Sequence, residues 1–292
     1  MQSSKKKKQV SAPSIQVSDK VETVEELHNV IFKPNEGPQT EFLAASEREV
    51  LYGGSAGGGK SYAMLADPLR YMGHPSFSGL LLRHTTEELR ELIFKSKEIY
   101  PQIWKGIKWS ERKMQWEAPS GARLWMSYLD RDDDVLRYQG LAFSWIGFDE
   151  LTQWSTPYAW NYMRSRLRST APDLPIYMRA TTNPGGRGHH WVKKMFIDPS
   201  PYGRPYDATD IETGEVLKYP AGHEKAGRPL FKRRFIPARL SDNPYLAEQG
   251  DYEAMLLSLP EQQRRQLLDG DWDIKEGAAF TEFDRNIHTV EP

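Results

Sequence analysis

The stretch Gly54-Ser55-Ala56-Gly57-Gly58-Gly59-Lys60-Ser61 decides the fold, because it fits the pattern G-x-x-x-x-G-K-[ST] at every position. The apolar run Glu49-Val50-Leu51-Tyr52 lies before it and predicts a short buried strand. Residues 61–72 then carry apolar side chains at helical spacing, with Pro68 expected to shorten the helix. A strand, a glycine-rich turn and a helix in this order surround a phosphate group with backbone N–H groups and with the positive end of the helix. The stretch therefore predicts a phosphate-binding loop (P-loop).

Each position of this loop has an expected role. The glycines let the backbone curl until its N–H groups face phosphate oxygens. The Lys60 ammonium is expected to neutralise the β- and γ-phosphates, and the Ser61 hydroxyl is expected to bind Mg²⁺. The predicted nucleotide-binding residues of the loop are Gly54, Ser55, Ala56, Gly57, Gly58, Gly59, Lys60 and Ser61. A merely flexible turn is the alternative, and the position between a strand and a helix argues against it.

An acidic pair, Asp149-Glu150, follows a second buried run at 145–148. A P-loop needs a carboxylate on the metal side at the end of another strand, so we expect Asp149 to hold Mg²⁺ through its coordination shell. Glu150 is expected to polarise the attacking water, which predicts hydrolysis of the nucleotide. Acidic pairs at strand ends are common on protein surfaces, so this prediction depends on the P-loop upstream.

Two further segments carry side chains that suit a nucleotide. Thr181-Thr182-Asn183 follow a predicted strand, where their hydroxyl and amide groups can bond the γ-phosphate or the water and report the loss of that phosphate. The following Pro184-Gly185-Gly186 also predicts an ordinary turn, and a turn can carry such a sensor. Gln39 lies before the P-loop, and its amide can donate to and accept from adenine. A helix surface is the alternative for Gln39.

The rest of the chain predicts strands that alternate with helices, which favours an α/β fold with a mainly parallel sheet flanked by helices. The further predicted strands are 79–82, 144–148 and 176–181. A helix start is predicted at 85–88, and an antiparallel hairpin is predicted from 114–117 and 124–128. Residues 199–229 predict an excursion from the core. Residues 244–257 and 260–268 predict two short helices that form a small lid subdomain, with Gly270 as the stop.

Composition excludes several classes of function. The chain has 292 residues, 27% of them charged, and a net charge of -1, so overall charge does not indicate a nucleic-acid binder. The absence of Cys excludes disulfides and thiolate zinc sites, and His189-His190 lacks companions at metal-ligand spacing. No stretch is long and apolar enough to span a membrane. Two locally basic stretches, 164–194 and 225–239, could hold a polyanion, with solvated surface as the alternative.

The order of these motifs resembles that of tailed-phage terminase large subunits. The resemblance covers about residues 35–292, and it rests on Gln39-x-x-Phe42, the P-loop, Arg137-Tyr138-Gln139-Gly140, 148–153, 179–186 and Gly270-Asp271-Trp272. It implies the ATPase domain of a viral DNA-packaging motor with a RecA-like, additional-strand P-loop fold and a lid, using ATP and Mg²⁺. We accordingly expect a disordered basic tail at 1–20, a P-loop ATPase core at 21–240, the lid at 241–275 and a linker at 276–292.

The resemblance also implies partners and a location. The expected partners are double-stranded DNA, a portal protein, a small terminase subunit and further copies of the chain in a ring, commonly of five, with no membrane. The expected location is the host cell cytoplasm, transiently at the procapsid portal and not in the mature virion. Relatives continue into a metal-dependent nuclease domain, whereas this sequence stops at Pro292. Nuclease activity is therefore not expected in this chain.

One departure from the family concerns arginine. Many relatives carry an Arg inside the P-loop where this chain has Ala56, which favours an arginine finger donated by a neighbouring subunit. Arg137 is the candidate, with Lys60 and Glu150 as the other catalytic residues, and Arg131 is the second choice. The alternative for Arg137 is a structural pair with the nearby aspartates. The alternative function is a DNA- or portal-binding structural module with a weak or vestigial nucleotide site.

Overall fold

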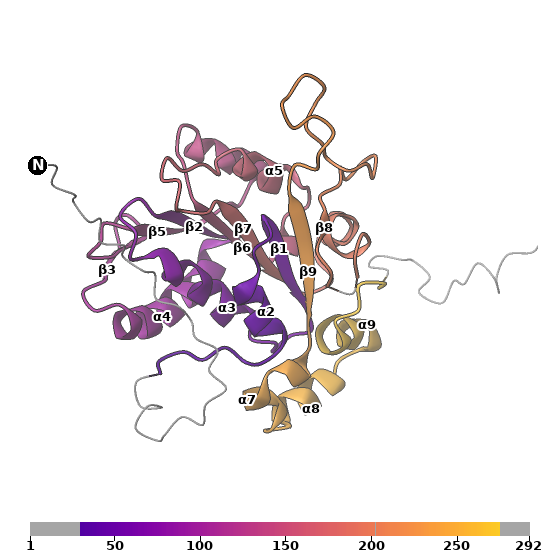
Figure 1. The fold of residues 1–292 in the computed structure, drawn as a ribbon. Helices are drawn as coiled ribbons and strands as arrows, with labels where there is room; N and C mark the ends of the chain where they lie inside the picture. The colour runs from indigo at the N-terminus through magenta and orange to yellow at the C-terminus, as the bar shows by residue number, and fades with distance from the viewer. Residues whose placement is uncertain (1–29, 202, 275–292) are drawn as a thin grey trace, which may run out of the picture.

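The computed structural model describes residues 30–201 and 203–274, which form one mixed sheet of nine strands between layers of helices (Figure 1). The strand order is β3-β4-β5-β2-β6-β7-β1-β9-β8. The parallel strands are β1 (Glu49–Gly54), β2 (Ser78–Arg83), β5 (Arg123–Tyr128), β6 (Trp145–Asp149), β7 (Tyr177–Thr182) and β9 (Lys232–Ala238). The antiparallel strands at the two edges are β3 (Lys108–Ser110), β4 (Gln115–Glu117) and β8 (Tyr206–Asp207). The predicted α/β class is confirmed.

Helices cover both faces of the sheet. One face packs against α2 (Pro38–Ala44), α3 (Lys60–Ala66), the 3-10 helix η1 (Asp67–Tyr71) and α4 (Thr86–Ile103). The other face packs against α5 (Tyr158–Arg164), α6 (His189–Val192) and the π-helix η4 (Lys193–Ile197). Side chains of a strand alternate between its two faces, so Leu51 packs with α5 whereas Val50 and Tyr52 pack with α2. Short 3-10 segments, η2 (Asp132–Tyr138) and η3 (Leu151–Gln153), follow β5 and β6.

A small helical lid follows β9 and lies at the end of the sheet where β1 and β9 finish (Figure 1). Its elements are η5 (Leu240–Asp242), α7 (Pro244–Ala247), α8 (Asp251–Leu257), α9 (Glu261–Arg264) and the π-helix η6 (Arg265–Asp269). The prediction of one helix over 244–257 is wrong, because Gly250 takes a left-handed φ of 69° and separates α7 from α8. Gly270 ends η6 with a φ of 66°, as the predicted stop requires.

The remaining sequence predictions have mixed outcomes. The predicted strands and the start of α4, where the Thr85 hydroxyl accepts from the Glu88 N–H, are confirmed. The predicted hairpin forms as β4 and β5, but β5 also pairs in parallel with β2 and so belongs to the central sheet. Of the predicted excursion, residues 206–207 form β8 at the edge of the sheet, and residues 211–229 form a largely exposed arm that projects away from the sheet (Figure 1). Strand β9 was not predicted, because its residues were assigned only to a basic stretch.

The predicted tail, 1–20, and the predicted linker, 276–292, lie outside the described residues. Among the helices of 30–201 and 203–274, none combines the length and the apolar character needed to cross a membrane.

Candidate nucleotide-binding site

Most of the predicted site residues lie together at the C-terminal ends of the parallel strands. The P-loop leaves β1, Asp149 ends β6, and Thr181 and Thr182 end β7, which lies between those two strands. The register pairs Thr181 with Tyr52 on one side and with Asp149 on the other. Because neighbouring strands lie about 5 Å apart, this order brings the loop, the acidic pair and the sensor segment together. Ligands of open α/β sheets bind at this edge.

The P-loop backbone is fixed by hydrogen bonds to β1, to the end of β9 and to the lid. The Tyr52 hydroxyl donates to the Gly58 carbonyl over 2.7 Å. The Ser55 N–H donates to the Ala238 carbonyl at the end of β9 over 2.8 Å, and the Ala56 N–H donates to the Leu267 carbonyl of the lid over 2.7 Å. The phosphate role predicted for Ser55 and Ala56 stays a prediction, but in this arrangement their N–H groups bind protein carbonyls, because β9 and the lid approach the loop closely.

Further lid contacts reach the centre of the loop. The Asn243 amide donates to the Gly57 carbonyl over 2.6 Å. A side chain at Gly57 would meet the side chains of Leu240 at 2.7 Å and Tyr252 at 2.9 Å, so a larger residue there would have to displace the lid side chains and would also be strained by the φ of 80°. The lid therefore packs directly on the backbone that is predicted to bind phosphate.

Gln39 supports the P-loop from the opposite side. Its side chain is 3% exposed, its amide nitrogen donates to the Gly59 carbonyl over 2.9 Å, and its amide oxygen accepts from the Asn35 N–H over 2.6 Å. The predicted contact with adenine remains a prediction. The geometry instead makes Gln39 a brace that holds the loop at Gly59.

Lys60 is buried at the first turn of α3, with a side chain directed at the site. Its ammonium donates to the Ser55 carbonyl over 2.5 Å. Burial lowers the pKa of Lys60, and the nearby carboxylates of Glu150 and Asp149 oppose that shift. The amine thus lies in the field of both acidic residues, where a P-loop lysine meets the terminal phosphates.

Asp149 is fully buried, and its two carboxylate oxygens have different neighbours. The Thr181 hydroxyl donates to Oδ1. The guanidinium Nε of Arg83 lies 3.2 Å from Oδ2, yet the angles make no hydrogen bond and leave both atoms without a hydrogen-bond partner among the described residues. Carboxylate oxygens suit a hard cation that takes oxygen ligands, but a cation at Oδ2 would have to displace the Arg83 guanidinium that lies beside it. The buried Asp149 carboxylate is the donor type that Mg²⁺ prefers, and Ser61 lies in the first turn of α3, where a P-loop serine is expected; the magnesium role of Ser61 stays a prediction.

Glu150 has an unusual backbone, with φ 58° and ψ 57°. Left-handed conformations are costly for residues with a side chain and gather at functional sites. Burial, and then the charge of Asp149, raise the pKa of Glu150, while Lys60 and Arg83 lower it. The Asn183 N–H donates to Glu150 Oε2 over 3.4 Å, so the predicted sensor segment contacts the predicted catalytic carboxylate.

The sensor segment is tied to the chain that follows Glu150. The Thr182 and Thr152 hydroxyls lie 2.7 Å apart in a hydrogen bond, and Thr152 Oγ1 also donates to the Asn183 carbonyl over 3.2 Å. Thr181 thus contacts Asp149 and Asn183 contacts Glu150, while Thr182 fastens the segment to Thr152.

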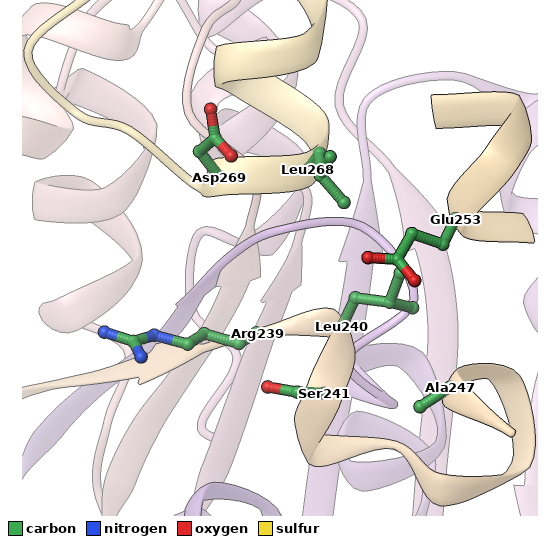
Figure 2. A pocket seen from close by; sticks show the side chains of 7 residues that line it. All are labelled: Arg239, Leu240, Ser241, Ala247, Glu253, Leu268 and Asp269. Carbon is green, nitrogen blue, oxygen red and sulfur yellow. The ribbon is translucent and has the colours of Figure 1, made fainter. Parts of the chain in front are cut away.

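A cavity of about 430 Å³ lies between the end of β9 and the lid (Figure 2). Its volume falls in the usual range for small-molecule sites. The lining side chains are Arg239, Leu240, Ser241, Ala247, Glu253, Leu268 and Asp269. Leu240 also borders Gly57, so the cavity opens beside the P-loop. These lining residues were not predicted, since nothing in the sequence relates the lid to the loop.

Arg137 takes part in none of the P-loop contacts described above, and residues close to it in sequence hold its side chain. Its guanidinium donates to the Tyr128 carbonyl over 2.7 Å and lies 3.6 Å from Asp134 Oδ1. The side chain is nevertheless 46% exposed. The structural alternative for Arg137 is thus realised within the chain, and its role towards a neighbouring subunit stays a prediction.

Several cations of the two basic stretches are paired within the chain, and the binding of a polyanion by these stretches stays a prediction. Arg179 and Arg233 are buried, near Asp67 and beside Glu49 respectively. Further cations of these stretches pair with carboxylates, namely Arg164 with Glu49, Arg234 with Glu41, Lys193 with Asp198 and Lys232 with Asp207. Much of the local positive charge is therefore neutralised by carboxylates of the same chain.

Sequence reasoning missed Arg83 and Asn243. Arg83 ends β2, which is the neighbour of β6, so an accurate strand order would have placed its side chain beside Asp149. Asn243 gave no signal of its own, because it binds the P-loop only after the lid folds back over it.

Comparisons with known proteins agree with this geometry. The profile of the family described as terminase large subunit, T4likevirus-type, N-terminal, matches residues 51–287. No curated protein sequence matches the chain significantly.

Among solved structures, the chain is similar to the large terminase of a thermophilic bacteriophage in complex with ADP, with a TM-score of 0.60 and 17% identity. That match covers 88% of this chain and 58% of the other, so this chain spans less than two thirds of that terminase. The chain is also similar to the large terminase ATPase domain of Thermus phage P74-26, with a TM-score of 0.52 and 13% identity over 86% of this chain and 98% of the other. These likenesses show a shared fold. Because the family profile spans most of the sequence, the chain belongs to the T4-like-virus type of terminase large subunits, matching their N-terminal part.

Proposed function

We propose that the chain binds ATP with Mg²⁺ in the P-loop and hydrolyses it to move double-stranded DNA into a procapsid. The observation that carries the proposal is the convergence of Lys60, Asp149 and Glu150 at one sheet edge, where the two carboxylates influence the pKa of the lysine. The similar bacteriophage terminase was solved with ADP and with ATP-γ-S, which supports an adenine nucleotide as the ligand.

Each group of site residues has a separate role in the proposed reaction. Lys60 and the backbone N–H groups of residues 57–61 would bind the phosphates, since those of Ser55 and Ala56 already bind protein carbonyls, and Ser61 with Asp149 would hold Mg²⁺. Bound Mg²⁺ supplies positive charge against the phosphate oxygens. Glu150 orients the attacking water and accepts its hydrogen bond, which requires an ionised carboxylate. Thr181 bonds Asp149 and Asn183 bonds Glu150, while Thr182 bonds Thr152, so this segment can respond to the loss of the γ-phosphate. The lid cavity beside Gly57 is the proposed place for the nucleoside.

The proposal extends to an assembly. Arg137 is exposed enough to reach a neighbouring subunit if it releases the Tyr128 carbonyl. An arginine that acts in this way accelerates hydrolysis by roughly a thousandfold or more. We propose that copies of the chain form a ring, of five, on a portal protein in the host cytoplasm, with a small terminase subunit as a further partner.

Two substitutions test the nucleotide site. Lys60→Ala should weaken ATP binding and abolish hydrolysis, because it removes the cation that meets the phosphates. Glu150→Ala should abolish hydrolysis and leave ATP binding within a few-fold, because Glu150 acts on water. Calorimetry with ATP-γ-S and a phosphate-release assay measure the two effects, with Glu91→Ala on α4 as a surface control. Equal loss of binding in both variants would contradict the role given to Glu150.

Mixing experiments test Arg137. An Arg137→Ala subunit should bind ATP and regain turnover when mixed with Glu150→Ala subunits, which retain the arginine. A mixture as inactive as both parents would refute action between subunits. A wild-type chain that binds DNA but never hydrolyses ATP would favour the structural module instead.

A further inference from the structure

His189 joins two parts of the site that are far apart in the sequence. It is 1% exposed and is the first residue of α6. Its Nδ1 accepts the Gly185 N–H over 2.8 Å, so Nδ1 carries no proton and the neutral ring carries its proton on Nε2. Nε2 lies 3.2 Å from the Trp272 carbonyl and donates to it. The imidazole also stacks on the Trp272 indole, with ring centroids 5.4 Å apart and planes 19° apart.

The Gly185 side of this contact leads to the predicted catalytic carboxylate. Gly185 belongs to the turn that begins at Asn183, directly after β7. The Asn183 N–H donates to Glu150 Oε2, and Glu150 holds a left-handed backbone. A shift of this turn therefore moves the Asn183 N–H, which donates a hydrogen bond to Glu150.

The Trp272 side leads to the lid and the P-loop. Trp272 follows Gly270, the residue that ends η6, and its indole lies 3.4 Å from the position that a side chain on Gly53 would take. A side chain at Gly270 would meet the Ser55 nitrogen at 2.6 Å, so the lid exit lies against the start of the loop. The Ala56 N–H donates to the Leu267 carbonyl of η6, which fastens the lid to the loop itself.

We propose that His189 is a positioning residue that couples the seating of the lid on the P-loop to the position of the Asn183–Gly186 turn and of Glu150. The inference rests on the proposed function, since Glu150 is there the residue that acts on water. The ring is suited to this task because its two nitrogens bond one partner on each side, while burial excludes water that would compete for them. His189 itself touches neither phosphate nor water in this role.

Three substitutions separate the two bonds. His189→Phe keeps a ring that can stack on Trp272 but loses both hydrogen bonds. His189→Asn keeps an acceptor near Nδ1 for the Gly185 N–H, and His189→Gln keeps a donor near Nε2 for the Trp272 carbonyl. The exposed neighbour His190, changed to Phe, is the matched control. Thermal unfolding identifies any variant that is not folded, and the remaining variants then carry the test.

If His189 couples the two parts, His189→Phe binds ATP-γ-S within about threefold of wild type while kcat falls, on the order of 10- to 100-fold, as small displacements of a catalytic group produce. His189→Asn and His189→Gln should both stay well below wild type, because each retains only one bond. His190→Phe should keep the wild-type rate. A wild-type rate for His189→Asn would overturn the inference, since it would mean that fixing the turn alone suffices.

Hydrogen exchange gives a readout that does not depend on turnover. In the wild type, ATP-γ-S should slow amide exchange in the lid, 239–270, and in the turn, 183–186, together. In His189→Phe the turn should lose this protection while the P-loop keeps it. Identical protection in both proteins would overturn the inference. A wild type that binds ATP-γ-S without hydrolysing ATP would instead refute the proposed function, and the exchange experiment would still test His189.

Discussion

Substitution of Glu49 by Gln is expected to destabilise the protein strongly, although Glu49 lies at the opposite end of β1 from the nucleotide site. Glu49 is the first residue of β1 and is fully buried. Its Oε2 accepts from Arg233 Nε over 2.7 Å, and its Oε1 accepts from Arg164 Nε. Arg233 is only 1% exposed, so the substitution leaves a buried guanidinium without a negative partner.

The magnitude follows from that burial. Removing one partner of a buried ion pair costs about 3–5 kcal/mol of unfolding free energy. A domain of this size loses about 2–4 °C of Tm per kcal/mol, so Glu49→Gln should lower Tm by about 6–20 °C. Urea unfolding and scanning calorimetry measure both quantities. The control is Glu91→Gln, which breaks an exposed i,i+4 pair with Lys95 and should change the unfolding free energy by about 0.5 kcal/mol or less.

The pH dependence supplies an independent check. Burial would raise the pKa of Glu49, but the charges of Arg233 and Arg164 outweigh it and hold the pKa below its usual value. A carboxylate whose pKa is lowered by folding contributes stability above its unfolded pKa and loses it as the pH falls through the folded pKa. Glu49→Gln should therefore flatten the acid limb of the stability profile. A loss no larger than that of Glu91→Gln, or no recovery when Arg233→Met is added, would refute the reasoning.

Three further predictions concern the site. Burial and the charge of Asp149 raise the pKa of Glu150, so kcat should begin to fall, as the pH is lowered, at a pH above the ordinary range of glutamate pKa values. An acid limb of the pH–rate profile within that ordinary range would contradict this prediction. Arg83→Gln removes a cation that lowers this pKa, so the limb of the pH–rate profile should move to higher pH, and an unmoved limb would exclude that influence. Gly270→Ala and Gly250→Ala both force a side chain into a left-handed backbone, at a cost on the order of 1 kcal/mol. Only Gly270→Ala meets the Ser55 backbone, so it alone should weaken ATP-γ-S binding by calorimetry, and equal effects would contradict the lid contact.

The sequence predicted those parts of the fold whose signals are local. The strand of Glu49–Gly54, the loop and α3 are consecutive, and apolar run, glycines and helical spacing describe them without knowledge of the rest of the chain. Strand β9 was missed because its buried position 233 is an arginine, which hides the apolar alternation. That arginine is buried only because Glu49, 184 residues away in sequence, lies beside it. The single helix expected over 244–257 failed for another reason, since a lone Gly250 did not reveal that the helix breaks there.

By itself, the sequence determined the P-loop, the acidic pair at the end of β6, the α/β class and the family, because each depends on residues adjacent in the chain or on the order of motifs. Only the tertiary structure placed Arg83 on Asp149, the lid carbonyl of Leu267 on the loop, and His189 between the sensor turn and Trp272. These contacts join segments that are distant in sequence. They exist because the strand order sets which strand ends are neighbours and because the lid folds back over the loop, and no local pattern specifies either.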